Sequence, residues 1–286
     1  MRSMNTATPA ARSGTPRAFG EHLRHWRQHR RLSQLDLAQE AEVSTRHLSF
    51  VETGRSAPSR EMVLRLAERL QVPLRDRNAL LVAAGFAPMY RERPLDDPAL
   101  APARRAVELI LKSHEPYPAL AVDRHWNLVA ANRMLPHMLA GADASLLQPP
   151  VNVLRLSLHP QGLAPNIVNL AQWRAHLLER LHQQIHATGD ATLAALLEEL
   201  RGYPVPVGIE ERLDGELLGV AVPLRIRTRV GELDFISTTT IFGTPVDVTL
   251  QELALETFFP GNEKTAQALR DLFAASVTPA PNPPSA

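Results

Sequence analysis

Histidines at helical spacing in this chain could bind a metal ion. His22, His25 and His29 follow at intervals of three and four residues, and His182 and His186 lie four residues apart. On a helix each set would share one face, as the histidines of a metal site do. No third ligand accompanies the second pair, and the chain has no cysteine. We therefore expect both sets to be surface residues, with no metal and no cofactor.

Recognisable catalytic motifs are missing from the sequence. It contains no nucleophile elbow, no phosphate-binding P-loop, no GxGxxG and no HExxH. The lack of cysteine excludes thiol catalysis and disulfides. Scattered acids and bases could still assemble a site, but no pattern indicates an enzyme, and we expect none.

Side chains between residues 44 and 55 have the chemistry to read nucleic acid. Arg46 can form two hydrogen bonds with guanine, and Thr45 or Phe50 can contact a thymine methyl group. Further arginines around the segment suit phosphate contact, namely Arg30, Arg31, Arg55 and Arg60. Phe50 could alternatively pack on the first helix, and the arginines could be solubilising charge. The segment thus predicts a face that reads bases. Which of its residues contact the DNA stays undecided.

Two short helices joined by a tight turn would position these side chains. Ser33 is followed three residues later by Asp36, a capping box that opens a helix over 34–41. Ser44 then caps a helix over 45–53 that ends at Gly54. Small or branched residues fall where two steeply crossing helices pack, at Ala38, Val43, Leu48 and Val51. This pattern is typical of a helix-turn-helix, whose second helix enters a major groove.

Three more helices complete the N-terminal domain. The apolar spacing predicts them over residues 19–30, 60–70 and 74–84. We therefore expect an all-α helix-turn-helix domain over residues 17–87. A disordered leader over 1–16 precedes it, and a proline-rich linker over 88–102 follows.

Charge is distributed unevenly along the chain. Residues 17–93 hold 14 Arg and no Lys against 9 acidic residues, whereas residues 94–286 are net acidic. A basic module on an acidic body is typical of a DNA-binding head on a separate effector domain.

The remaining chain predicts an α+β domain over residues 103–275, followed by a disordered tail over 276–286. Helical runs are expected over residues 103–113, 132–139, 169–186, 191–200 and 265–275. Alternating patterns predict antiparallel strands within residues 119–131, 217–229, 233–242 and 246–250. Together they predict a small sheet with helices packed on it.

A few polar residues lie in otherwise apolar parts of this second domain. Among them, Arg155, His159 and Arg174 are candidates to bind the head of a ligand. A buried carboxylate needs a cationic or hydrogen-bonding partner. Structural explanations stay open as well, because His159 begins a turn and Arg174 could lie on a solvated helix face.

The helix-turn-helix segment resembles the XRE family of phage-repressor-like regulators. RHLSFVETGRSAPSREMVLRLAERLQVPLRDRNALLVAAGFAP is similar to the MmyB-like branch of that family, as are LHPQGLAPNIVNLAQWR and LALETFFPGNEKTAQALR near the C-terminus. The resemblance implies that the second domain is PAS-like, with a small antiparallel sheet and helices that close an apolar pocket. It also implies an apolar ligand, of which fatty acids are the best-known kind.

The resemblance further implies roles for single residues. Arg27 and Glu52 match an ion pair between the first helix and the recognition helix. Gln34 matches a residue that anchors the domain on the DNA backbone. The family usually has glycine where this chain has Glu42, so a left-handed turn would be strained by on the order of 1 kcal/mol. The candidate DNA-binding residues are Gln34, Ser44, Thr45, Arg46, His47, Ser49, Phe50 and Arg55.

These observations predict a cytoplasmic, sequence-specific transcription regulator that binds double-stranded DNA. We expect a homodimer, because such helices read two half-sites about one helical turn apart, and a small apolar ligand, such as a fatty acid. No apolar run is long enough for a membrane span. Two alternatives stay open. A protein-interaction module of antitoxin or adaptor type would lack salt-dependent DNA affinity, and an enzyme fused to a DNA-binding head would turn its ligand over.

Overall fold

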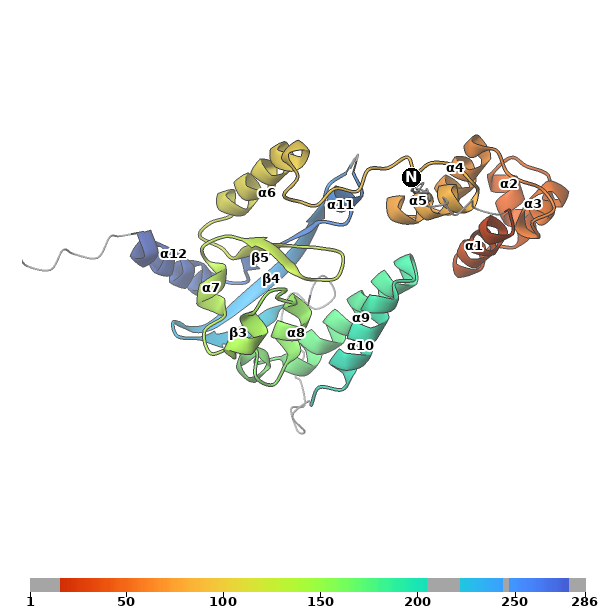
Figure 1. Cartoon of the computed structure of the whole chain (residues 1–286). Helices are drawn as coiled ribbons and strands as arrows, with labels where there is room; N and C mark the ends of the chain where they lie inside the picture. Colours follow the sequence, from red (N-terminus) through yellow and green to blue (C-terminus); the bar gives the residue numbers. More distant parts are fainter. Residues whose placement is uncertain (1–15, 205–221, 244–246, 278–286) are drawn as a thin grey trace, which may run out of the picture. The chain divides into compact units, whose positions relative to one another are not determined.

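The computed structural model describes residues 16–204, 222–243 and 247–277 (Figure 1). The chain forms two compact units. The first extends to Glu92 and also includes residues 247–248, and the second comprises the other described residues from Arg93 onward. Most of the predicted leader and tail, and the start of the strand predicted over 217–229, lie outside the described residues. Within the described ranges, no helix is both long and apolar enough to cross a membrane.

Five helices build the described part of the first unit, as the sequence predicts. They are α1 (Pro16–His29), α2 (Gln34–Glu40), α3 (Thr45–Glu52), α4 (Arg60–Arg69) and α5 (Leu74–Ala83). The helices α2, α3 and α4 each begin after a serine whose side chain accepts a hydrogen bond from a backbone N–H of the first turn. At Ser33, Asp36 completes the predicted capping box.

Apolar side chains from all five helices form the core of this unit. Helix α1 contributes Phe19, Leu23 and Trp26. It approaches α3 so closely at Gly20 that an added Cβ would lie 2.4 Å from the carbonyl oxygen of Glu52. Between α2 and α3, Glu42 has a φ of 55°, so the turn is left-handed and the strain expected in that case applies.

An antiparallel sheet forms the centre of the second unit. Its strands are β1 (Ala119–Val122), β2 (Leu128–Ala131), β3 (Leu224–Thr228), β4 (Gly231–Ile241) and β5 (Ala254–Pro260). Their order is β2-β1-β5-β4-β3. The central strand β5 pairs on both sides, so that Thr257 lies opposite Ala119 of β1 and Thr238 of β4. With helices packed on the sheet, this order confirms the predicted α+β, PAS-like fold class.

One predicted strand is wrong. The sequence predicts a strand over 246–250, but the described part of that segment contains the short helix α11 (Val248–Gln251), and the last strand is β5. Asp247 is fully buried, and the backbone N–H of Val248 donates to the carbonyl of Arg91 at 2.8 Å. The alternating apolar residues here therefore do not mark the face of a sheet. In β5, by contrast, Glu256 interrupts the apolar face and weakens the alternation.

Helices cover both faces of the sheet (Figure 1). Besides α11, the helices of the second unit are η1 (Pro98–Leu100), α6 (Ala101–Ser113), α7 (Leu135–Met138), η2 (Ala144–Leu147), α8 (Val153–Leu158), η3 (Ala164–Asn166), α9 (Leu170–Thr188), α10 (Ala191–Arg201) and α12 (Glu263–Val277). Helix α6 packs on one face in a small core, and α7 to α10 belong to a larger core on the other. Strand β1 serves both, because Leu120 belongs to the larger core and Ala121 to the smaller.

Candidate nucleic-acid interface and ligand pocket

Helix α3 presents two different faces. Leu48, Val51 and Glu52 are buried, whereas Arg46 in the first turn is exposed. The side-chain oxygen of Ser44 accepts the N–H of residue 47 at 3.1 Å, so this predicted contact residue also holds the helix end. The remaining candidates on the helix are half-buried, namely Thr45, His47, Ser49 and Phe50. Helix α3 thus offers an arginine and small polar groups from its first two turns.

Phe50 lies beside two arginines. The guanidinium carbons of Arg46 and Arg55 lie 5.4 and 6.0 Å from the centre of its ring, within the range of a cation–π interaction. Phe50 is not among the described residues that form or line the helical core, so the alternative in which it packs on the first helix finds no support. The three side chains form a cationic and aromatic cluster beside α3.

A buried ion pair holds α3 against α1. Arg27 Nε and Nη2 donate to the two carboxylate oxygens of Glu52 at 2.6 and 3.0 Å. The Glu52 side chain is fully buried, and Gln34 Nε2 donates to it at 2.7 Å. The hydrogen bond with Glu52 raises the pKa of Arg27, which keeps the guanidinium charged. Gln34 therefore ties the start of α2 to this pair, and its contact with DNA stays a prediction.

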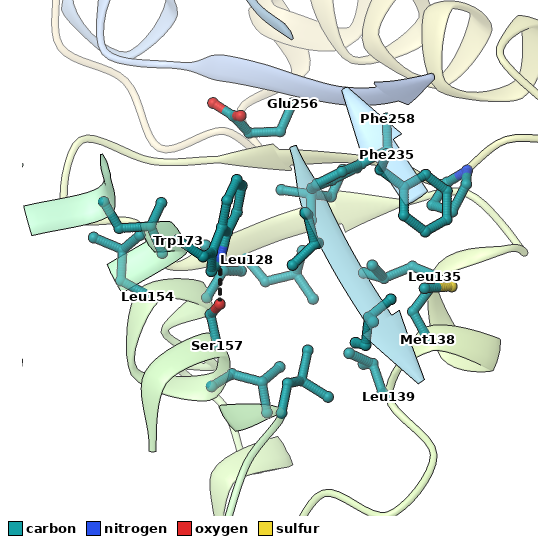
Figure 2. Close-up of a pocket in the computed structure, with 18 of the residues that line it drawn as sticks. Leu128, Leu135, Met138, Leu139, Leu154, Ser157, Trp173, Phe235, Glu256 and Phe258 are labelled. Atoms are coloured by element: carbon teal, nitrogen blue, oxygen red, sulfur yellow. Dashed lines mark hydrogen bonds between the residues drawn. The ribbon is translucent and has the colours of Figure 1, made fainter. Parts of the chain in front are cut away.

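A cavity of about 100 Å³ lies between the sheet and the helices of the larger core (Figure 2). Leucines are the most frequent residues in its wall, and two tryptophans and two phenylalanines add aromatic surface. The charged or hydroxyl side chains among its lining residues are Ser157, Arg180 and Glu256. Mostly apolar walls with a few polar groups are typical of pockets that accept apolar molecules.

Helices α8 and α9 build one side of this pocket. In α9, Trp173, Leu177 and Arg180 follow at helical spacing, so they lie along the same face toward the pocket. Helix α8 contributes Ser157, whose Oγ accepts the indole N–H of Trp173 at 3.0 Å (Figure 2). This hydrogen bond orients the Trp173 ring in the wall and joins the two helices.

Arg180 and Glu256 form an ion pair in the pocket wall. Arg180 Nη1 and Nη2 lie 3.2 and 2.5 Å from the two carboxylate oxygens of Glu256. Thr239 Oγ1 donates to the same carboxylate at 2.8 Å, and the guanidinium lies 4.6 Å from the ring of Trp126. The Glu256 side chain is 7% exposed and that of Arg180 26%. Burial, and then the charge of Arg180, lower the pKa of nearby His176, so this histidine is neutral at pH 7.

The three residues predicted to bind a ligand head lie elsewhere. Arg155 Nε and Nη2 donate to Glu199 at 2.6 and 2.7 Å. Arg174 Nη2 donates to a backbone carbonyl at 2.8 Å, and the ring of His159 lies edge-on to Tyr203. None of these three candidates is among the lining residues of the pocket. Each is held in a protein contact outside that wall.

Sequence reasoning missed the pair that does line the pocket. Arg180 falls on the apolar stripe of α9, and Glu256 falls on the face of β5 that carries Phe258. A charged residue on an apolar face is unusual enough to have marked each of them. Their pairing joins residues 76 positions apart, however, and no local pattern contains that information.

Comparison with known proteins covers both units. Residues 103–272 match the family described as the MmyB-like transcription regulator ligand binding domain, and residues 18–80 match a helix-turn-helix domain. No curated protein sequence matches the chain. The chain is similar to the restriction-modification controller protein C.AhdI from Aeromonas hydrophila, with 31% identity over 22% of this chain and 94% of that one, at a TM-score of 0.21. It is also similar to the clp gene regulator ClgR from C. glutamicum, with 29% identity over 24% of this chain and 86% of that one, at a TM-score of 0.22.

Proposed function

The chain belongs to the MmyB-like family of DNA-binding transcription regulators, and we propose that α3 reads duplex DNA while the pocket of the second unit senses a small apolar ligand. The observation that carries the first part is the exposed first turn of α3, where Arg46 lies beside small polar side chains. The observation that carries the second part is the apolar cavity behind α8 and α9. Two copies of the chain would place two α3 helices in successive major grooves, so we propose a homodimer on the DNA.

Arg46 is the residue most suited to read a base. Its side chain is exposed at the N-terminal end of α3, the end that enters the groove in helix-turn-helix proteins. A bidentate pair with guanine contributes about 1–3 kcal/mol of discrimination. Arg46→Ala is therefore expected to weaken binding to the preferred site by that amount and to relax preference at one base pair.

The experiment selects the preferred duplex from a random pool and measures Kd values for wild type and variant. Arg69→Ala is the matched control, because Arg69 is an exposed arginine in the last turn of α4. It removes the same charge and should leave base preference unchanged. Equal loss on all duplexes with Arg46→Ala would show that Arg46 contacts phosphate only.

The pocket favours apolar ligands for energetic reasons. Each methylene group moved from water into such a wall contributes about 0.8 kcal/mol, and the lining offers few groups that a polar ligand could bind. The fatty acid implied by the family resemblance stays a prediction. Arg180, the guanidinium in the pocket wall, is better placed to meet a ligand head than the three residues singled out from the sequence.

Mass spectrometry of molecules extracted from the purified protein tests this part. Leu139→Trp fills the pocket from its edge, whereas Leu109→Trp adds the same side chain on α6, where residue 109 is 66% exposed. We expect an apolar compound from the wild type and from Leu109→Trp, and little or none from Leu139→Trp. Equal recovery from both variants would contradict the proposed pocket.

A further inference from the structure

The charges in the pocket wall determine which head groups it can hold. Among the lining residues, Arg180 is the cation and Glu256 is the anion. Arg180 contacts both carboxylate oxygens of Glu256, and Thr239 donates to the same carboxylate. His176 beside them is neutral at pH 7, because its pKa is lowered. The wall therefore has no net charge, because the carboxylate of Glu256 neutralises the charge of Arg180.

We propose that this pocket selects neutral apolar ligands that carry a hydrogen-bond acceptor, and that Glu256 enforces the selection by neutralising Arg180. The inference rests on the proposed function, because it concerns the same pocket. An ionised head group would have to draw Arg180 away from Glu256, which would leave a buried carboxylate without its partner. Beside the intact pair it would meet the like charge of Glu256. A ketone, ester or lactone meets neither cost, and a fatty acid binds only as its protonated form.

Ser157 of α8 offers a hydrogen-bond donor to a neutral acceptor. The Oγ of Ser157 accepts the N–H of Trp173, which leaves the proton of the hydroxyl for another partner. No hydrogen bond among the described residues uses that proton. The indole N–H of Trp126, in contrast, already donates to Gln184 at 2.8 Å. Ser157 is thus placed to orient a carbonyl oxygen in an otherwise apolar pocket, as single polar groups do in many ligand sites.

Two ligands of nearly identical shape test the selection. Decanoate and undecan-2-one differ in that a methyl group of the ketone replaces the charged oxygen of the acid. Their binding to the full-length protein is measured near neutral pH through tryptophan fluorescence, since Trp126 and Trp173 line the pocket. We expect the ketone to bind at least about tenfold more tightly than the acid. Equal affinities, or tighter binding of the acid, would overturn the proposal.

Glu256→Gln tests whether Glu256 is responsible for the selection of neutral ligands. The amide keeps the size of the side chain and frees the charge of Arg180, so the affinity for decanoate should rise about tenfold while that for the ketone stays within about twofold. Glu199→Gln is the matched control, because it removes the same charge from the pair with Arg155, which does not line the pocket. The control should alter neither affinity.

The remaining outcomes separate this proposal from the function it rests on. Ser157→Ala should weaken binding of the ketone about fivefold, because the hydrogen bond to its carbonyl oxygen is lost. A Glu256→Gln protein that binds the ketone normally and decanoate no better than wild type would refute the role of Glu256. If that variant does not fold, the wild-type comparison of the two ligands decides. Failure of both ligands and of decanol to bind the wild type would count against the proposed ligand pocket itself.

Discussion

At the scale of single residues, the backbone of Glu42 is strained in the turn between α2 and α3. Its φ of 55° lies in the left-handed region, where a side chain costs about 1 kcal/mol relative to glycine. Glu42→Gly is expected to stabilise the first unit by roughly 0.4–1 kcal/mol, because the relief exceeds the entropy that glycine adds to the unfolded chain. Chemical denaturation measures the change. Glu40→Gly, at the end of α2, is the control and should destabilise by about 1 kcal/mol.

A stability of Glu42→Gly as low as that of Glu40→Gly would show that the Glu42 side chain makes a stabilising contact. The resemblance to a family with glycine at the position of Glu42 is enough to predict strain there if the turn is left-handed, because the strain depends only on the local backbone.

The pair of Arg155 and Glu199 predicts a pH dependence. Hydrogen bonds from Arg155 lower the pKa of Glu199 to about 2. Because this value lies below that of the unfolded chain, about 4.3, the pair stabilises the fold at neutral pH, and that stability is lost as the pH falls from about 4.3 to about 2. The Glu199 side chain is 37% exposed, so solvent screening limits the contribution to roughly 1 kcal/mol.

Glu199→Gln should therefore lower stability at pH 7 by about that amount and flatten the loss of stability below pH 4. Urea denaturation across this pH range provides the measurement. Glu263→Gln removes a carboxylate whose partner Arg270 is exposed, and should keep the slope of the wild type. Identical slopes for wild type and Glu199→Gln would mean that the pair does not persist in solution.

At the scale of elements, the ion pair of Arg27 and Glu52 positions α3 on α1. Removing one partner leaves the other charge buried, which costs about 3–5 kcal/mol. Arg27→Met should thus increase amide hydrogen exchange throughout α1 and α3. The double variant Arg27→Met/Glu52→Leu leaves no buried charge unpaired, because Arg24, which also contacts Glu52, is 47% exposed, and it should recover much of the protection. If the double variant exchanges as fast as the single one, the pair is not what joins the two helices.

The sequence predicts the capped helices of the first unit well, but it does not predict the charged pair in the pocket. Serines at 33, 44 and 59 cap their helices through backbone contacts three residues away, so a local pattern is sufficient. Strand β5 was missed because Glu256 faces the larger core, where an apolar residue is expected. Its charge is compensated by Arg180 from a helix far along the chain, and a rule of alternation cannot anticipate such a partner.

The ligand-binding candidates chosen from the sequence do not line the pocket, and the reason is again tertiary packing. Arg155, His159 and Arg174 were singled out as cations in apolar surroundings, yet each side chain has a protein contact outside the lining of the cavity. Which face of a short helix meets a cavity depends on packing between α8, α9 and the sheet. That packing is tertiary information, and periodicity alone does not supply it.

At the scale of the whole molecule, a basic helix-turn-helix unit is joined to a unit with an apolar pocket and net negative charge. A regulator of this composition is expected to lose DNA affinity steeply as salt increases, because released counterions drive binding. The presence of a DNA-binding site and a ligand site is not sufficient for sensing. The ligand must bind the second unit with different affinities in the DNA-bound and free states.

The measurement that tests this coupling most directly is the Kd of the full-length protein for its selected duplex, by fluorescence anisotropy, with and without ligand. Decanoate, decanol and undecan-2-one are compared, and thermal melting identifies which of them bind. We expect every compound that stabilises the protein to change the DNA Kd as well, by about 5- to 150-fold. Leu139→Trp should abolish the change and leave the unliganded Kd as it was. A DNA Kd that stays constant with every stabilising compound would contradict the claim that this protein senses a ligand.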